Sequence, residues 1–338
     1  MTENIRTIHY GLGPIGAAIA RLVTQRPGFT IVGGIDIDPA KAGRDIGEVI
    51  GLDAPLGVTV SDQPGEVLAS SQADIVVHST GSFLKQVQPQ LLEIIAAGLD
   101  IVSTCEELSY PWMQHPAQAY ELDRVARQHK VTVVGTGVNP GFIMDTLPIA
   151  LTAVCQEVRR IRVQRIVDAS QRRLPLQRKI GAGLTAEEFA ARVETGTVKH
   201  VGLPESVATI ADALEWRLDR IEETIEPLIA DRPLKSKYIE VQPGQVAGLQ
   251  QIARGWKGDE AVITLDLRMQ IGAEEAGDSV FIEGTPNLEM VVKGIHGDVA
   301  TAAIVVNAIP RVMKAPPGLL AMKDLPPACA PGKNQMGF

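Results

Sequence analysis

Apolar and polar positions divide the chain into two parts. In about the first 145 residues, short apolar runs of strand length alternate with stretches that carry apolar residues at helical spacing. The apolar runs lie at 6–10, 30–35, 74–81, 100–105 and 131–135, and the helical patterns include 14–23, 86–97 and 116–128. Repeated strand–helix units of this kind predict an α/β fold on a doubly wound parallel sheet.

The pattern changes after about residue 150. Residues 158–169 alternate apolar residues with arginines, which is typical of a strand with one face in water. Helices are predicted over 186–193, preceded by the capping-box pair Thr185 and Glu188, and over 205–223. Long strands are predicted at 237–241 continuing past 246, at 260–270, at 279–283 and at 288–293. This order predicts a second, α+β domain built on a mixed or antiparallel sheet.

A glycine-rich turn joins the first predicted strand to the first helix and fits the pattern G-x-G-x-x-G. Gly11 permits the tight turn, Gly13 lets the backbone approach a pyrophosphate, and Gly16 lets the helix pack against the strand. Asp36 ends the second strand about twenty residues later, where an acidic side chain meets a ribose 2′-hydroxyl. These features predict a Rossmann-type dinucleotide-binding domain. Its loop contacts are expected from Gly11, Leu12, Gly13, Pro14, Ile15 and Gly16.

A strongly apolar helix is predicted to begin near Asp298, and so apolar a helix is buried. We expect it to return to the first domain, followed by an extended strap over the proline- and glycine-rich residues 316–338. The sequence therefore predicts a dinucleotide-binding domain of residues 1–148 plus 298–338. Residues 149–297 form the predicted substrate-binding domain, whose long one-faced sheet also supports a homodimer.

Composition excludes several classes of function. The 338 residues carry a formal net charge of −8, which argues against a nucleic-acid partner. No apolar run approaches the ~18–20 residues that span a bilayer, and the first residues lack a signal-peptide pattern. Three widely spaced cysteines and six scattered histidines give neither a disulfide framework nor a metal site. A cytoplasmic protein without a metal is expected.

Further site candidates follow the other strands, because ligands collect at the carboxyl edge of a parallel sheet. Cofactor contacts are expected there from Ser79, Thr80, Gly81, Asn139 and Pro140, with Cys105 as a small buried contact. The substrate pocket is expected to include Val138, Phe142, Ile143 and His200. Asp36 repels a 2′-phosphate and favours NAD, whereas the nearby Lys41 and Arg44 offset that repulsion, so NADP stays open.

The candidate catalytic residues are Glu106 and Glu107, which follow a strand beside the expected nicotinamide. A carboxylate at this position can move a proton or stabilise a positive charge. Adjacent carboxylates on a turn point apart, so one of them is expected to face the substrate. The alternative role for either is to cap the next helix. The cluster Arg172, Arg173 and Arg178 either binds a substrate carboxylate or lies in a solvated loop.

Several of these segments together resemble one known family. They are the loop at 11–16, Asp36-Ile37-Asp38-Pro39, Ser103-Thr104-Cys105-Glu106-Glu107-Leu108, and Gly137-Val138-Asn139-Pro140-Gly141-Phe142. They are similar to the 2,4-diaminopentanoate dehydrogenase and native amine dehydrogenase family, whose first domain is dihydrodipicolinate reductase-like. The resemblance implies NAD(P)-dependent oxidative deamination of an amine, or reductive amination of a ketone or aldehyde with ammonia, by a glutamate in an apolar pocket.

That glutamate maps onto Glu106 or Glu107. Similar glucose–fructose oxidoreductase-like proteins carry Cys-Glu-Lys-Pro with a catalytic lysine, and Glu107 stands at the lysine position, which favours Glu107. The missing lysine weighs against sugar dehydrogenation. The His-His and Lys-x-Asp-Ala-Pro-Ser-Gly-Thr segments of dihydrodipicolinate reductases are also missing from this sequence. The alternatives are a dehydrogenase of another small oxo or hydroxy compound and a non-catalytic dinucleotide-sensing protein.

Overall fold

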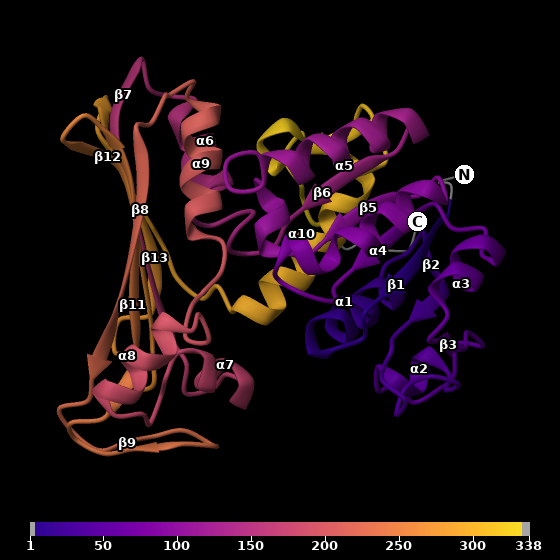
Figure 1. Cartoon of the computed structure of the whole chain (residues 1–338), viewed down its shortest axis with the longest axis horizontal. Coiled ribbons are helices and arrows are strands. Elements are labelled where there is room, and N and C mark those ends of the chain that lie inside the picture. Colours follow the sequence, from indigo (N-terminus) through magenta and orange to yellow (C-terminus); the bar gives the residue numbers. More distant parts are fainter. Residues whose placement is uncertain (1–3, 333–338) are drawn as a thin grey trace. The chain divides into compact units, whose positions relative to one another are not determined.

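The computed structural model describes residues 4–332. These residues form two compact units, one of residues 4–142 with 296–332 and one of residues 143–295 (Figure 1). The predicted domain boundaries fall a few residues later along the chain. The functional roles assigned to the two domains stay predictions.

The first unit is built on a seven-stranded sheet in the order β15-β6-β5-β4-β1-β2-β3, and its strand pairs are parallel. The strands are β1 Ile5–Tyr10, β2 Phe29–Ile35, β3 Val60–Ser61, β4 Ile75–His78, β5 Asp100–Ser103, β6 Thr132–Gly135 and β15 Gly318–Leu320. The helices are α1 Pro14–Thr24, α2 Ile46–Val49, α3 Pro64–Ser70, α4 Leu84–Ala96, α5 Pro116–His129 and α10 Gly297–Val312, with short 3₁₀ turns η1 Glu106–Ser109 and η2 Met322–Asp324. The predicted doubly wound sheet is confirmed.

Two apolar layers cover the sheet of the first unit. On one side α1 packs with α10, and the core there includes Ile19, Val77 and Val305, all fully buried. On the other side α4 packs with α5, around Leu91 and Leu122. Burial on both faces explains why β4, β5 and β6 carry consecutive apolar residues rather than alternating ones.

The second unit is built on a six-stranded mixed sheet in the order β14-β13-β7-β12-β11-β8, which confirms the predicted α+β domain. Its strands are β7 Glu157–Asp168, β8 Arg220–Ile229, β11 Val246–Lys257, β12 Glu260–Gln270, β13 Gly277–Thr285 and β14 Leu288–Val292, with a separate β9 Leu234–Lys235 and β10 Glu240–Val241 pair. The helices are α6 Thr146–Thr152, α7 Leu174–Lys179, α8 Ala186–Glu194 and α9 Leu203–Ala213. Helix α9 packs on β8, β11 and β12. Figure 1 shows it beside this sheet.

The helix predicted over 205–223 is wrong beyond residue 213. Helix α9 ends at Ala213, and Glu215 adopts a φ of +53°, which interrupts the helical path. From Arg220 the chain forms β8, in which more and less exposed residues alternate while the backbone pairs with β11. The glutamates of this segment suit the exposed face of a helix as well as that of a strand, so composition alone did not separate the two.

Two smaller predictions also need correction. The strand predicted from 237 past 246 is two strands, because Gly244, with a φ of +87°, turns the chain between β10 and β11. The predicted C-terminal strap contains β15, which pairs with β6, and the turn η2. Residues 333–338 of that strap lie outside the described residues.

Candidate active site

The glycine loop lies between the end of β1 at Tyr10 and the start of α1 at Pro14. Gly11 has a φ of +92°, and a Cβ there would lie 2.6 Å from the carbonyl oxygen of Ser79. A Cβ on Gly16 would collide with the carbonyl oxygen of Gly11. By contrast, a Cβ on Gly13 would meet nothing within 4 Å. The loop is therefore closed on its sheet side and open at Gly13, where a pyrophosphate needs access to the α1 N-terminus.

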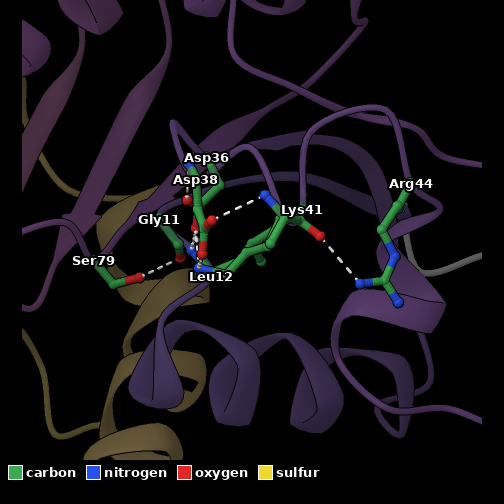
Figure 2. Close-up of polar contacts among 8 residues, drawn as sticks. Gly11, Leu12, Asp36, Asp38, Lys41, Arg44 and Ser79 are labelled. Carbon is green, nitrogen blue, oxygen red and sulfur yellow. Dashed lines mark hydrogen bonds and ion pairs between the residues drawn. The ribbon is translucent and has the colours of Figure 1, made fainter.

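Asp36 is tied directly to this loop (Figure 2). Its Oδ2 accepts the N–H of Leu12 at 2.7 Å and the Lys41 ammonium at 2.9 Å, and its Oδ1 accepts the N–H of Asp38 at 2.9 Å. Burial raises the pKa of the Asp36 carboxyl, but these donors outweigh burial and lower that pKa below its usual value. Asp36 is therefore a charged acceptor that fixes the loop.

Lys41 and Arg44 differ in their placement. Lys41 pairs with Asp36 and, at 3.4 Å, with Asp38. Arg44 is exposed and bonds to Glu48 and to the carbonyl of Ala40. Of these two residues, only Lys41 contacts the Asp36 carboxylate, which is expected to face the ribose. Its charge is already shared between two carboxylates.

The turn after β4 closes the other side of the glycine loop. Ser79 donates its Oγ–H to the carbonyl of Gly11 at 2.7 Å, and its N–H donates to Tyr10 at 2.7 Å. Thr80 and Gly81 follow on the more exposed part of the turn. His78, which precedes them, is fully buried beside Ser103 and Gln90, and burial lowers its pKa to about 4. These contacts are those of a histidine in the core of the unit.

The segment after β6 carries buried polar groups without partners. A cis peptide joins Asn139 to Pro140, and Asn139 is 9% exposed. Within residues 4–332 neither side-chain polar atom of Asn139 has a hydrogen-bond partner, nor does the hydroxyl of Thr136. A buried amide without partners is costly, so these atoms mark a place where a ligand would complete the hydrogen bonding. Asn139 was predicted from the sequence, whereas Thr136 was missed because an isolated threonine carries no pattern.

Cys105 and the glutamates follow β5. Cys105 is 1% exposed within the apolar core, and burial raises the pKa of its thiol to about 12. Glu107 extends its carboxylate to the start of α4, where Oε2 accepts the N–H of Leu84 at 2.6 Å. The same oxygen lies 3.1 Å from Nε2 of His115, although the two are not aligned for a hydrogen bond. Glu107 therefore bonds to the start of α4, the helix that precedes it in the chain, and not to the first turn of the next helix as the alternative expected. Glu106 begins η1 and is half-buried.

His115 was not identified from the sequence. Its contact with Glu107 joins residues from two separate elements, and it has no spacing signature. The one local signal is that His115 precedes Pro116 at the start of α5.

The four predicted pocket residues lie in different units. Val138 and Phe142 belong to the first unit, where Phe142 packs against the α1–α10 core. Ile143 and His200 belong to the second unit, and Ile143 is fully buried. The backbone of His200 is held by Gln251 at 2.8 and 2.7 Å. Burial, with the charges of Lys179, Arg165 and Arg172, lowers the His200 pKa to about 3. The assignment of these residues to a pocket stays a prediction.

The arginine cluster lies around α7 in the second unit. Arg172 is buried, and its carbonyl accepts a hydrogen bond from Gln177 at 2.9 Å. Arg173 precedes the first helical residue and Arg178 lies in the last turn.

Within residues 4–332, no group of three or more His, Cys, Asp and Glu side chains could hold a metal ion. None of the helices in this part of the chain is long and apolar enough to cross a membrane.

Comparison with known families matches both parts of the chain. Residues 142–336 match the model of the 2,4-diaminopentanoate dehydrogenase C-terminal domain. Residues 5–103 match the model of the dihydrodipicolinate reductase N-terminus.

Individual relatives agree along nearly the full length. The chain is 35% identical to 2,4-diaminopentanoate dehydrogenase of Acetoanaerobium sticklandii, over 96% of this chain and 94% of that protein. It is 25% identical to amine dehydrogenase of Streptomyces virginiae, over 95% and 96%. The solved structure of amine dehydrogenase from Mycobacterium smegmatis superposes with a TM-score of 0.87 at 27% identity, covering 97% and 98% of the two chains. The chain belongs to the 2,4-diaminopentanoate dehydrogenase family of oxidoreductases.

Proposed function

We propose that this protein is an NAD(P)-dependent amine dehydrogenase. It would catalyse reversible oxidative deamination of a small amine, which in reverse is reductive amination of a ketone or aldehyde with ammonia. The observation that carries the proposal is the pair Glu106 and Glu107 at the end of β5, in the same sheet whose β1–α1 turn is shaped for a dinucleotide. The names of the relatives support the same chemistry.

The residues of the first unit fit a nicotinamide dinucleotide. Gly13 and the N-terminus of α1 would hold the pyrophosphate, and Asp36 the adenosine ribose. The partnerless amide of Asn139 would be satisfied by polar atoms at the nicotinamide end. When bound, the cofactor supplies or accepts the hydride at the carbon that carries nitrogen.

The carboxylates handle charge and protons around that carbon. Loss of water from the ammonia adduct of a carbonyl compound leaves a cationic C=N group, which a fixed carboxylate stabilises. The same group can take and return protons while nitrogen adds and water leaves. Glu107 holds the Leu84 N–H at the start of α4, so we give it a positioning role, and we propose the other carboxylate of the pair, Glu106, for the handling of charge and protons. This assignment reverses the preference drawn from the sequence.

Paired variants of the two glutamates test this assignment. We expect Glu106→Gln to lower kcat by roughly 10²–10⁴-fold with little change in the Kd for NADH, because the amide retains shape but neither charge nor basicity. Glu107→Gln replaces the charged oxygen that contacts both the Leu84 N–H and His115 by a weaker, neutral acceptor, so it should weaken NADH binding more than it lowers kcat. The opposite result, with turnover lost only in Glu107→Gln, would restore the original assignment.

Ammonia dependence separates the competing functions. With NADH or NADPH and a panel of ketones and aldehydes, we expect oxidation of the cofactor only when ammonia is present. Ammonia-independent oxidation would instead identify a dehydrogenase of oxo or hydroxy compounds. Binding without turnover for every substrate would identify a non-catalytic dinucleotide-sensing protein.

For the cofactor, we propose a preference for NAD. Asp36 is held in its charged form and would repel a 2′-phosphate, while the charge of Lys41 is divided between Asp36 and Asp38. The ratio of Kd values for NADH and NADPH measures this preference.

We also propose that the protein is a cytoplasmic homodimer whose two subunits contact each other through the six-stranded sheet. Gly255 faces α9, because a Cβ there would meet Val207, so Gln250 and Ile252 point to the other face. On that face the Asp266 carboxylate accepts a hydrogen bond from the side-chain amide of Gln250 at 2.9 Å. The same carboxylate forms an ion pair with Arg268 at 2.9 Å. Light scattering of the purified protein tests the dimer.

A further inference from the structure

Glu107 holds the turn between β4 and α4 through two of its groups. Its carboxylate Oε2 accepts the N–H of Leu84, the first residue of α4, at 2.6 Å. Its own N–H donates to the carbonyl of Ser82 at 3.2 Å. The start of α4 and the turn before it are therefore fixed to η1 rather than to their own side chains, since α4 has no side-chain cap of its own.

His115 approaches the same carboxylate from the N-terminus of α5. Its Nε2 lies 3.1 Å from Oε2 of Glu107, and the two side chains are 23% and 15% exposed. The His115 backbone is fixed as well, because its N–H donates to Pro111 at 2.8 Å and its carbonyl accepts from Ala119 at 2.9 Å. The His115 ring and the Glu107 carboxylate are therefore held next to each other by two separate elements, α5 and η1.

The turn that Glu107 holds also supports the glycine loop. Ser79 begins the turn and donates to the carbonyl of Gly11 at 2.7 Å. A Cβ on Gly11 would lie 2.6 Å from the Ser79 carbonyl oxygen, so the two backbones have almost no spare room between them. A displacement of the turn would therefore reach the loop that is shaped for the pyrophosphate.

We propose that His115 is a positioning residue for dinucleotide binding. Acting through Glu107, it holds residues 79–83 and the start of α4 in the position that the glycine loop requires. The proposal rests on the dinucleotide binding of the proposed function and not on its amine chemistry. Loss of the contact should therefore weaken cofactor binding and leave the rate of the saturated enzyme nearly unchanged.

Substitutions of His115 in the full-length protein test this role. His115→Phe keeps a planar ring without nitrogen, and His115→Gln offers the Glu107 carboxylate an uncharged N–H donor at similar reach on a more flexible side chain. We expect His115→Phe to raise the Kd for NADH, measured by fluorescence titration, roughly three- to tenfold. His115→Gln should recover most of the affinity, and kcat at saturating NADH should stay within about twofold. The control is His129→Gln at the exposed C-terminal end of α5.

Hydrogen exchange provides a second readout that does not require a bound cofactor. In His115→Phe, the peptide covering residues 79–87 should exchange faster than in the wild type, while peptides of the second unit remain unchanged. Wild-type affinity and exchange in His115→Phe, or equal losses in the Phe and Gln variants, would overturn the proposal. If the wild-type protein binds neither NADH nor NADPH, the proposed function fails, whereas the exchange experiment still tests His115.

Discussion

At the scale of single residues, Asp36 connects sequence motif, loop geometry and charge. It is the acidic residue expected after the second strand, and its carboxylate holds the Leu12 N–H of the glycine loop. Burial alone would raise its pKa, but the donors from Asp38, Lys41 and Leu12 lower it. A carboxyl whose pKa is lower in the folded state stabilises the fold above its unfolded pKa of about 4. That stabilisation disappears as the pH falls through the lower, folded pKa.

The Asp36→Asn substitution should therefore cost stability in a pH-dependent way. Urea unfolding at pH 7 should show the variant less stable than the wild type, and the gap should shrink as the pH falls below about 4. Asp53→Asn, at an exposed position of the same unit, should show a much smaller gap at pH 7. A gap that widens towards low pH would contradict the lowered pKa of Asp36.

At the scale of elements, helix ends decide much of the local structure. Thr185 accepts the Glu188 N–H at 3.2 Å, and the Glu188 carboxylate accepts the Thr185 N–H at 2.9 Å, which confirms the predicted capping box of α8. We expect Thr185→Ala to reduce the free energy of unfolding by about 1 kcal/mol, because two N–H groups lose their partners or their geometry. Thr195→Ala at the other end of α8 should cost only a few tenths of that amount. Equal losses would contradict the capping role.

At the scale of the whole molecule, the first unit depends on a segment that follows the second unit in the chain. Helix α10 supplies the buried residues Val305, Ile309 and Val312, and β15 completes the sheet edge beside β6. A chain that ends at residue 295 should therefore lose cooperative unfolding of the first unit and become sensitive to protease. The full-length protein is the control. Thermal unfolding with limited proteolysis measures both.

The features that sequence predicted best are local or repeated. The glycine loop needs a particular backbone conformation and close packing at fixed positions, and only glycine meets these needs. Three glycines at the right spacing, followed by Asp36, therefore predicted the loop. The two-domain α/β and α+β architecture followed from the change in apolar period. The helix predicted over 205–223 was wrong beyond Ala213, because glutamates suit the exposed face of a helix and the exposed face of a strand alike. The contact of His115 with Glu107 was not predicted, since it joins η1 to the start of α5 across an irregular turn that carries no spacing pattern.

The interruption of the first unit by residues 143–295 has a consequence for synthesis on the ribosome. When Phe142 emerges, α4 and α5 are available for one side of the sheet, but on the other side α1 lacks its partner α10, because α10 and β15 are still untranslated. At about 5–20 residues per second, the interval before residue 296 emerges is roughly 10–30 s. During that time the second unit is still emerging, while the nascent first unit exposes the apolar surface that α10 later covers. Chaperones should accordingly bind nascent chains most strongly between the emergence of Phe142 and the emergence of residue 296.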